Sequence, residues 1–160
     1  IATIRLLDID IKNENIKKGI TKIDNMARLQ EIKSGKLKDL VKDNILLLDG
    51  SHNEDGSRVL NEYLKTLDCK KHVIVGMMAN KDHKKYISYF KDISSLTTVD
   101  IPNQPNSISG KKLKEIFKDL SNVEYKESIT MAVKSIPLEK DDLLLITGSL
   151  YLAGEVLNLN

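Results

Sequence analysis

Cysteine, tryptophan and long apolar runs are scarce or absent in this sequence. Among the 160 residues Cys69 is the single cysteine, so no disulfide can form within the chain, and we expect a reducing, cytoplasmic setting. No apolar run approaches the roughly 20 residues that cross a bilayer. Charged residues such as Arg5 and Asp8 interrupt any signal-peptide pattern in the first stretch. We therefore expect no membrane partner.

A large excess of positive or negative charge is also missing. The 25 basic and 23 acidic residues give a formal net charge of +2, and the two signs are interleaved along the chain. This balance argues against a nucleic-acid partner held by a broad basic field, although it leaves local anion sites open. A composition of 41% hydrophobic and 30% charged residues is typical of a globular chain, and this length suits one domain.

Several short motifs that carry known chemistry do not occur. The sequence contains no G-x-G-x-x-G, no G-x-x-x-x-G-K-[ST], no H-E-x-x-H and no G-x-S-x-G. Cys69 lies three residues before His72, but one cysteine and one histidine do not make a metal site. We expect His72 and His83 at the surface and no metal bound by this chain.

Apolar runs alternate with stretches of helical spacing through most of the chain. Six runs are expected as strands, at 27–32, 45–48, 72–75, 96–101, 123–125 and 143–146. Apolar residues recur at helical spacing over 59–67, 113–120 and 129–136. Runs that are apolar on both sides, separated by amphipathic helices, are what a parallel sheet covered by helices requires. The sequence predicts a Rossmann-like α/β fold with a mostly parallel six-stranded sheet and helices on both faces.

The first residues do not follow this alternation. Ile4, Leu7 and Ile11 form an apolar helical face for which the chain offers no obvious partner. We interpret residues 1–20 as the tail of a preceding domain with its linker, and residues 21–160 as one domain.

Polar residues follow three of the expected strands, at 49–56, 76–82 and 147–151. Ligands of open α/β sheets bind beyond the carboxyl ends of the strands, so we expect these three junctions along one edge. Asp49 is suited to accept hydrogen bonds from sugar hydroxyls or an ammonium group. The turn at Ser149 is suited to cradle a carboxylate or a phosphate.

Each of these residues also has a purely structural interpretation. Asp49, Asp55 and Ser149 are favoured helix N-caps, and His52 could be a simple loop histidine. The pattern of residues alone therefore predicts a site without a reaction.

Four segments stand in an order that points to a family. They are Ala27-Arg28-Leu29-Gln30, Leu48-Asp49-Gly50-Ser51-His52-Asn53, Gly76-Met77-Met78-Ala79-Asn80-Lys81-Asp82 and Thr147-Gly148-Ser149-Leu150-Tyr151. Their order resembles folylpolyglutamate synthase, whose bacterial members often double as dihydrofolate synthase. The resemblance covers about residues 20–157 and corresponds to the C-terminal domain of the Mur-ligase-like superfamily. The chain departs from the family at Asn25-Met26-Ala27 (usually W-P-G), Glu54 (usually proline) and Asn80 (usually aspartate).

The resemblance implies ATP-dependent amide ligation, in which a carboxylate is phosphorylated and the amine of L-glutamate then displaces phosphate. It implies that Arg28 contacts nucleotide phosphate or ribose and that Asp49 holds ribose hydroxyls. His52 would lie where nucleotide and glutamate meet, and with Asp49 it would be catalytic. Ser149 and Asp82 would join His52 in binding glutamate.

The resemblance further implies ATP and Mg²⁺ as cofactors, with the metal ligands in an N-terminal ATPase domain whose end would be residues 1–20. Folate or dihydropteroate and L-glutamate would be the substrates of a cytoplasmic, monomeric enzyme. The isolated chain is expected to be inactive. Two alternatives stay open: the C-terminal domain of a cell-wall Mur ligase, which the D-G-S-H-N segment disfavours, and a non-catalytic nucleotide-binding module.

Overall fold

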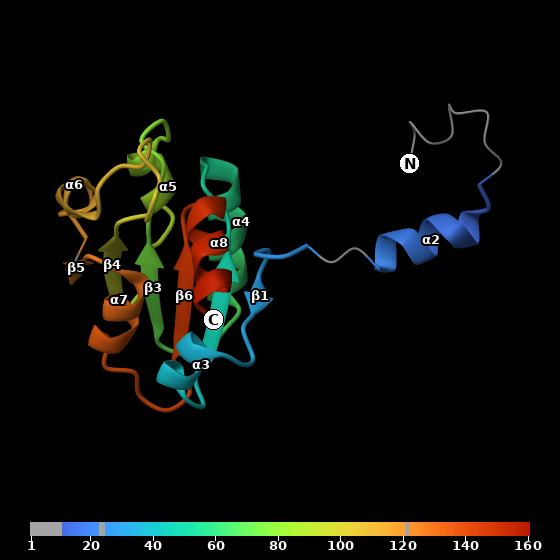
Figure 1. The fold of residues 1–160 in the computed structure, drawn as a ribbon, viewed down its shortest axis with the longest axis horizontal. Coiled ribbons are helices and arrows are strands. Elements are labelled where there is room, and N and C mark those ends of the chain that lie inside the picture. Colours follow the sequence, from blue (N-terminus) through green and yellow to red (C-terminus); the bar gives the residue numbers. More distant parts are fainter. Residues whose placement is uncertain (1–10, 23–24, 121) are drawn as a thin grey trace.

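The computed structural model describes residues 11–22, 25–120 and 122–160 (Figure 1). Helix α2 spans Asn13–Thr21 and has no buried residue. Of the apolar face expected near the start of the chain, Ile4 and Leu7 lie outside the described residues, so that expectation is not tested. No helix among the described residues is both long and apolar enough to span a bilayer.

The strands form one six-stranded sheet in the order β1-β2-β6-β3-β4-β5. Their bounds are β1 Gln30–Glu31, β2 Ile45–Asp49, β3 Lys71–Val75, β4 Ser95–Val99, β5 Val123–Lys126 and β6 Leu143–Thr147. Strands β2 to β6 pair in parallel, and β1 adds to β2 in the antiparallel sense. This arrangement confirms the predicted mostly parallel sheet.

The first predicted strand is wrong in length. Residues 27–32 were expected to be extended, but only Gln30–Glu31 pair with β2. The cause lies in Ala27 and Leu29, whose φ angles of 56° and 45° are left-handed and do not fit a strand.

Helices cover both faces of the sheet, as predicted (Figure 1). One face carries α3 Lys36–Val41, α7 Ile129–Ser135 and α8 Leu150–Leu159, and the other carries α4 Glu54–Lys65, α5 His83–Ile87 and α6 Gly110–Ile116. Strand β2 is continuously apolar because its successive side chains point into both layers. Leu46 and Leu48 pack into the first layer, and Leu47 packs into the second.

The helical spacing at 59–67 fills the core only in part. In α4, Leu60 and Leu64 are buried, whereas Val59 and Tyr63 are 51% and 38% exposed. Val59 therefore remains available to line a surface pocket.

Strand register brings the three polar junctions together. Asp49 at the end of β2 is level with Thr147 of β6, and Thr147 is level with Val75 of β3. Since these strands are neighbours, the junctions that follow them lie side by side at one edge, as the sequence predicted.

Candidate functional site

The loop between β2 and α4 presents His52 at the centre of this edge. The carbonyl of Ser51 accepts a hydrogen bond from the Gly148 N–H at 3.0 Å, which ties the loop to the turn after β6. His52 Nδ1 lies 3.0 Å from the Gly50 carbonyl. Because a carbonyl only accepts, Nδ1 carries the proton and Nε2 is the ring nitrogen left for a ligand.

Asp49 anchors two loops through its carboxylate. Its Oδ2 accepts the Leu29 N–H at 2.9 Å and its Oδ1 accepts the Ser51 N–H at 2.8 Å. The residue is only 4% exposed. Asp49 therefore lies beneath the rim of the site and holds the segment that carries Arg28 as well as the loop that carries His52.

Arg28 lies in a tight segment between two left-handed residues. Left-handed φ angles at the non-glycine residues Ala27 and Leu29 cost roughly 1–3 kcal/mol each, and they persist only where other contacts hold them. The Ala27 carbonyl accepts the Gly50 N–H at 2.8 Å, and the Ala27 N–H donates to Gln30 Oε1 at 2.8 Å. These contacts hold the backbone while the Arg28 side chain stays exposed.

Arg28 and His52 line one pocket, which we call the Arg28 pocket, of about 450 Å³. Its lining consists of Arg28, Leu29, Asp49, Ser51, His52, Asn53, Asp55, Gly56, Val59 and Leu60. Leu29 and Val59 give it an apolar side, and Arg28 gives it a positive charge beside that side. Two carboxylates also line it, that of Asp55 and that of Asp49, which accepts two backbone N–H groups. An apolar surface next to a guanidinium suits a ligand with a flat ring and phosphate groups.

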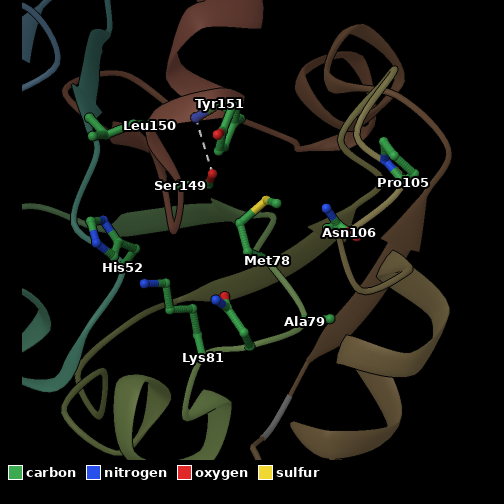
Figure 2. A pocket seen from close by; sticks show the side chains of 10 residues that line it. His52, Met78, Ala79, Lys81, Pro105, Asn106, Ser149, Leu150 and Tyr151 are labelled. Carbon is green, nitrogen blue, oxygen red and sulfur yellow. Dashed lines mark hydrogen bonds between the residues drawn. The ribbon is translucent and has the colours of Figure 1, made fainter.

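A second pocket, which we call the Lys81 pocket, has a volume of about 680 Å³ and shares His52 with the first. It is lined by His52, Met78, Ala79, Asn80, Lys81, Pro105, Asn106, Ser149, Leu150 and Tyr151 (Figure 2). No acidic side chain is among these lining residues. Figure 2 shows the Lys81 amine extending toward the side of the pocket that holds His52. This arrangement suits a ligand with a carboxylate.

Backbone pairing builds the far wall of the Lys81 pocket. The Ala79 N–H donates to the Asn106 carbonyl at 2.9 Å, and the Ile108 N–H donates to the Met77 carbonyl at 3.1 Å. Asp100 secures this loop, because it accepts the Gly110 N–H at 2.7 Å and the Tyr125 hydroxyl at 2.5 Å. The bond to Asp100, together with partial burial, raises the pKa of Tyr125 to about 12.

Two of the predicted site residues act as helix caps. Ser149 is 2% exposed, and its Oγ accepts the Tyr151 N–H at 3.1 Å, the bond drawn in Figure 2. Asp82 caps α5 by accepting the Lys85 N–H at 3.1 Å and lines neither pocket. The structure thus brings Arg28, Asp49, His52 and Ser149 to the two pockets and leaves Asp82 outside them.

The structure corrects two smaller expectations. Asp55 is not the cap of α4, because Asn53 accepts the Gly56 N–H at 2.9 Å in that role. His72 is not at the surface but is 6% exposed, with Nδ1 2.8 Å from Ser95 Oγ and Nε2 3.3 Å from Asp142 Oδ2. These partners, of which Asp142 is buried, lie at the amino ends of the strands, at the opposite edge of the sheet from the pockets.

Reasoning from the sequence missed Gln30, Val59 and Asn106. The helical spacing at 59–67 indicated a core position for Val59, which the structure leaves 51% exposed. The places of Val59 and Asn106 at the pockets depend on the packing of distant segments. Gln30 belongs to the first of the four segments that carry the resemblance, but nothing in that segment indicated that its side chain contacts the Ala27 N–H.

Comparisons with known proteins agree with this fold. The family model described as "Mur ligase, glutamate ligase domain" matches residues 28–150. Folylpolyglutamate synthase of Lacticaseibacillus casei is 28% identical over 145 residues, which cover 89% of this chain and 31% of that protein.

Solved structures of similar fold include Escherichia coli FolC in complex with DHPP and ADP. It has a TM-score of 0.79 at 18% identity, over 98% of this chain and 36% of that one. The bifunctional folylpolyglutamate synthase/dihydrofolate synthase of Yersinia pestis, complexed with AMPPNP and Mn ion, has a TM-score of 0.74 at 18% identity, over 94% and 35%. The chain spans about a third of the length of the relatives it matches. Because the family model covers most of the sequence, the chain belongs to the family of Mur ligase glutamate ligase domains.

Proposed function

We propose that this chain is the C-terminal, glutamate-adding domain of an ATP-dependent ligase of the folylpolyglutamate synthase type. Its substrates are L-glutamate and a folate, and we propose dihydropteroate as a second acceptor. The observation that carries the proposal is that two pockets with different chemistry share one side chain, His52. One pocket suits a nucleotide and the other suits an amino acid, so the reacting groups would meet at that residue.

The proposed reaction joins a carboxylate to an amine. The terminal phosphoryl group of ATP is transferred to a carboxylate oxygen of the acceptor, which gives an acyl phosphate and ADP. The glutamate amine attacks the acyl carbon, a tetrahedral intermediate forms, and the bond to the phosphate oxygen breaks. The attacking nitrogen loses a proton, and phosphate leaves.

The residues of this chain have separate parts in that proposal. Arg28 neutralises charge on the nucleotide phosphates, and Lys81 attracts a carboxylate of the incoming glutamate. His52 Nε2 accepts a hydrogen bond or a proton from the attacking amine, since Nδ1 is committed to the Gly50 carbonyl. The Ser149 hydroxyl, whose oxygen already accepts the Tyr151 N–H, donates to the glutamate. Asp49 holds the segments that carry Arg28 and His52 in place by accepting the Leu29 and Ser51 N–H groups.

The proposal places the divalent metal in another part of the enzyme. No group of three or more His, Cys, Asp or Glu side chains that could hold a metal ion is found in the described part of the chain. The proposed reaction assigns no Mg²⁺ ligand to this chain. We propose that its ligands and the phosphate-binding loop belong to an ATPase domain of the same polypeptide, linked through residues 1–20.

The test is the transfer of labelled L-glutamate by the complete polypeptide in the presence of ATP and Mg²⁺. We expect incorporation into a reduced folate and into dihydropteroate, with one ADP formed for each glutamate added. The isolated domain, residues 21–160, should be inactive. Incorporation only into a muramoyl-peptide acceptor would favour a cell-wall ligase, and no incorporation with any acceptor would favour a nucleotide-binding module.

A further inference from the structure

The backbone around Arg28 is held in a conformation that the sequence does not favour by itself. Residues 27–30, which we call the Arg28 clip, include two non-glycine residues with left-handed φ angles on either side of the arginine. No glycine relieves these positions. Other parts of the domain must therefore supply the contacts that keep the clip in this form.

Three hydrogen bonds hold the clip. On the far side of Arg28, Asp49 Oδ2 accepts the Leu29 N–H at 2.9 Å. On the near side, the Gly50 N–H donates to the Ala27 carbonyl at 2.8 Å. The third bond is internal to the clip, from the Ala27 N–H to Gln30 Oε1 at 2.8 Å.

Gln30 has the geometry of a support and not of a ligand-binding residue. Its side chain is half-buried, and it is absent from the lining of both pockets. Strand β1 fixes its backbone, because Gln30 pairs with Leu48 of β2. The Gln30 carboxamide therefore reaches back from a fixed strand to the Ala27 N–H and closes the clip.

We propose that Gln30 is a positioning residue for nucleotide binding: by accepting the Ala27 N–H it holds the Arg28 clip in its left-handed form and directs the Arg28 guanidinium into the Arg28 pocket. The link to nucleotide rests on the proposed function, whereas the clip rests on the geometry alone. A glutamate at position 30 can accept the same bond, but alanine or methionine cannot.

The clip is tested by limited trypsin digestion of the complete polypeptide, with cleavage after Arg28 followed by mass spectrometry. Proteolysis of an ordered segment requires local opening, so the rate reports how firmly the clip is held. We expect cleavage at Arg28 to be several-fold faster in Gln30→Ala and Gln30→Met, and unchanged in Gln30→Glu. Gln104→Ala, which alters the other glutamine of the chain, is the matched control.

The link to nucleotide is tested by the affinity for fluorescent ADP and by the KM for ATP. We expect Gln30→Ala to weaken both roughly tenfold, the loss typical of one hydrogen bond to a charged group, with the KM for glutamate unchanged. Gln30→Glu should restore both values. If Gln30 acts through Arg28, adding Gln30→Ala to Arg28→Ala should weaken ADP binding no further.

Each failure has a distinct meaning. Unchanged cleavage at Arg28 in both Gln30→Ala and Gln30→Met would overturn the clip. Faster cleavage with unchanged ADP affinity, or additive losses in the double variant, would overturn positioning through Arg28. Gln30→Met keeps the bulk of the side chain, so it decides the matter if Gln30→Ala does not fold. Loss of the proposed function would show separately, as an unmodified enzyme that adds no glutamate.

Discussion

At the scale of single residues, Asp49 combines a structural and a functional position. The resemblance to folylpolyglutamate synthase implies a contact with ribose, yet both carboxylate oxygens already accept backbone N–H groups. Truncation would leave two loop amides without their acceptor and would disturb Arg28 and His52 together. Turnover alone therefore cannot separate the two roles of Asp49, and stability has to be measured beside it.

We predict that Asp49→Ala lowers the free energy of unfolding by about 2–4 kcal/mol, because two partly buried amides lose a charged acceptor. Urea denaturation of the purified protein measures the change. Asp82→Ala is the matched control, since Asp82 only caps α5 and its loss should cost about 1 kcal/mol. Equal, small losses in the two variants would mean that Asp49 does not anchor the loops.

Tyr125 makes the free energy of unfolding depend on pH in the alkaline range. Its hydrogen bond to Asp100 raises its pKa from 10.0 to about 12, so the folded chain keeps a phenol proton that the unfolded chain has lost. The unfolded state binds fewer protons in this window, and the free energy of unfolding must fall as the pH rises.

We therefore expect the Tyr125 contribution to be complete below pH 10.0 and lost as the pH approaches about 12. Tyr125→Phe should show a shallower decline in unfolding free energy over this window than the unmodified protein. Burial also raises the pKa of Tyr86, but Tyr86 is present in both proteins and cancels in the comparison. An equally steep decline in the unfolding free energy of Tyr125→Phe and of the unmodified protein would contradict the role given to the Tyr125 hydroxyl.

At the scale of elements, the sequence predicted those strands and helices whose formation depends on the spacing of hydrophobic residues. Continuous apolar runs gave the parallel strands, and helical spacing gave α4, α6 and α7, because burial on two faces or on one stripe leaves a periodic trace. The segment at 27–29 was missed because its left-handed turns depend on Asp49 and Gly50, which lie 20 or more residues away. The burial of His72 was missed for a similar reason: its partner Asp142 becomes a neighbour only through the pairing of β3 with β6.

The turn between β6 and α8 depends on a glycine. Gly148 has a φ of 106°, and a Cβ there would lie 2.7 Å from the Gly76 carbonyl oxygen. We predict that Gly148→Ala lowers the unfolding free energy by at least about 2 kcal/mol, because both the conformation and the space exclude a side chain.

Gly154→Ala is the matched substitution within the same segment. Gly154 lies inside α8 with nothing within 4 Å of a Cβ, so alanine should stabilise the helix by roughly 0.5–1 kcal/mol. Thermal and urea unfolding of the two variants should therefore shift in opposite directions. A Gly148→Ala variant as stable as the unmodified protein would contradict this explanation of the turn.

At the scale of the whole molecule, the edge that carries the site follows from the fold class. Parallel strands end on one side, so residues after β2, β3 and β6 had to share a rim. The fold class did not determine which residues form pockets at this rim. The Lys81 pocket exists because the segments at 77–79 and 106–108 pair through their backbones, and no periodic pattern in the sequence records that contact.

The central claim is that the two pockets meet at His52 and that ligation takes place there. The most direct measurement is the rate of labelled glutamate transfer to a reduced folate by the complete polypeptide carrying His52→Ala, with its thermal midpoint recorded beside it. We predict a fall in kcat of about a hundredfold, the usual size of a lost acid–base group, and an unchanged midpoint. A variant that transfers glutamate at the rate of the unmodified enzyme would contradict the account.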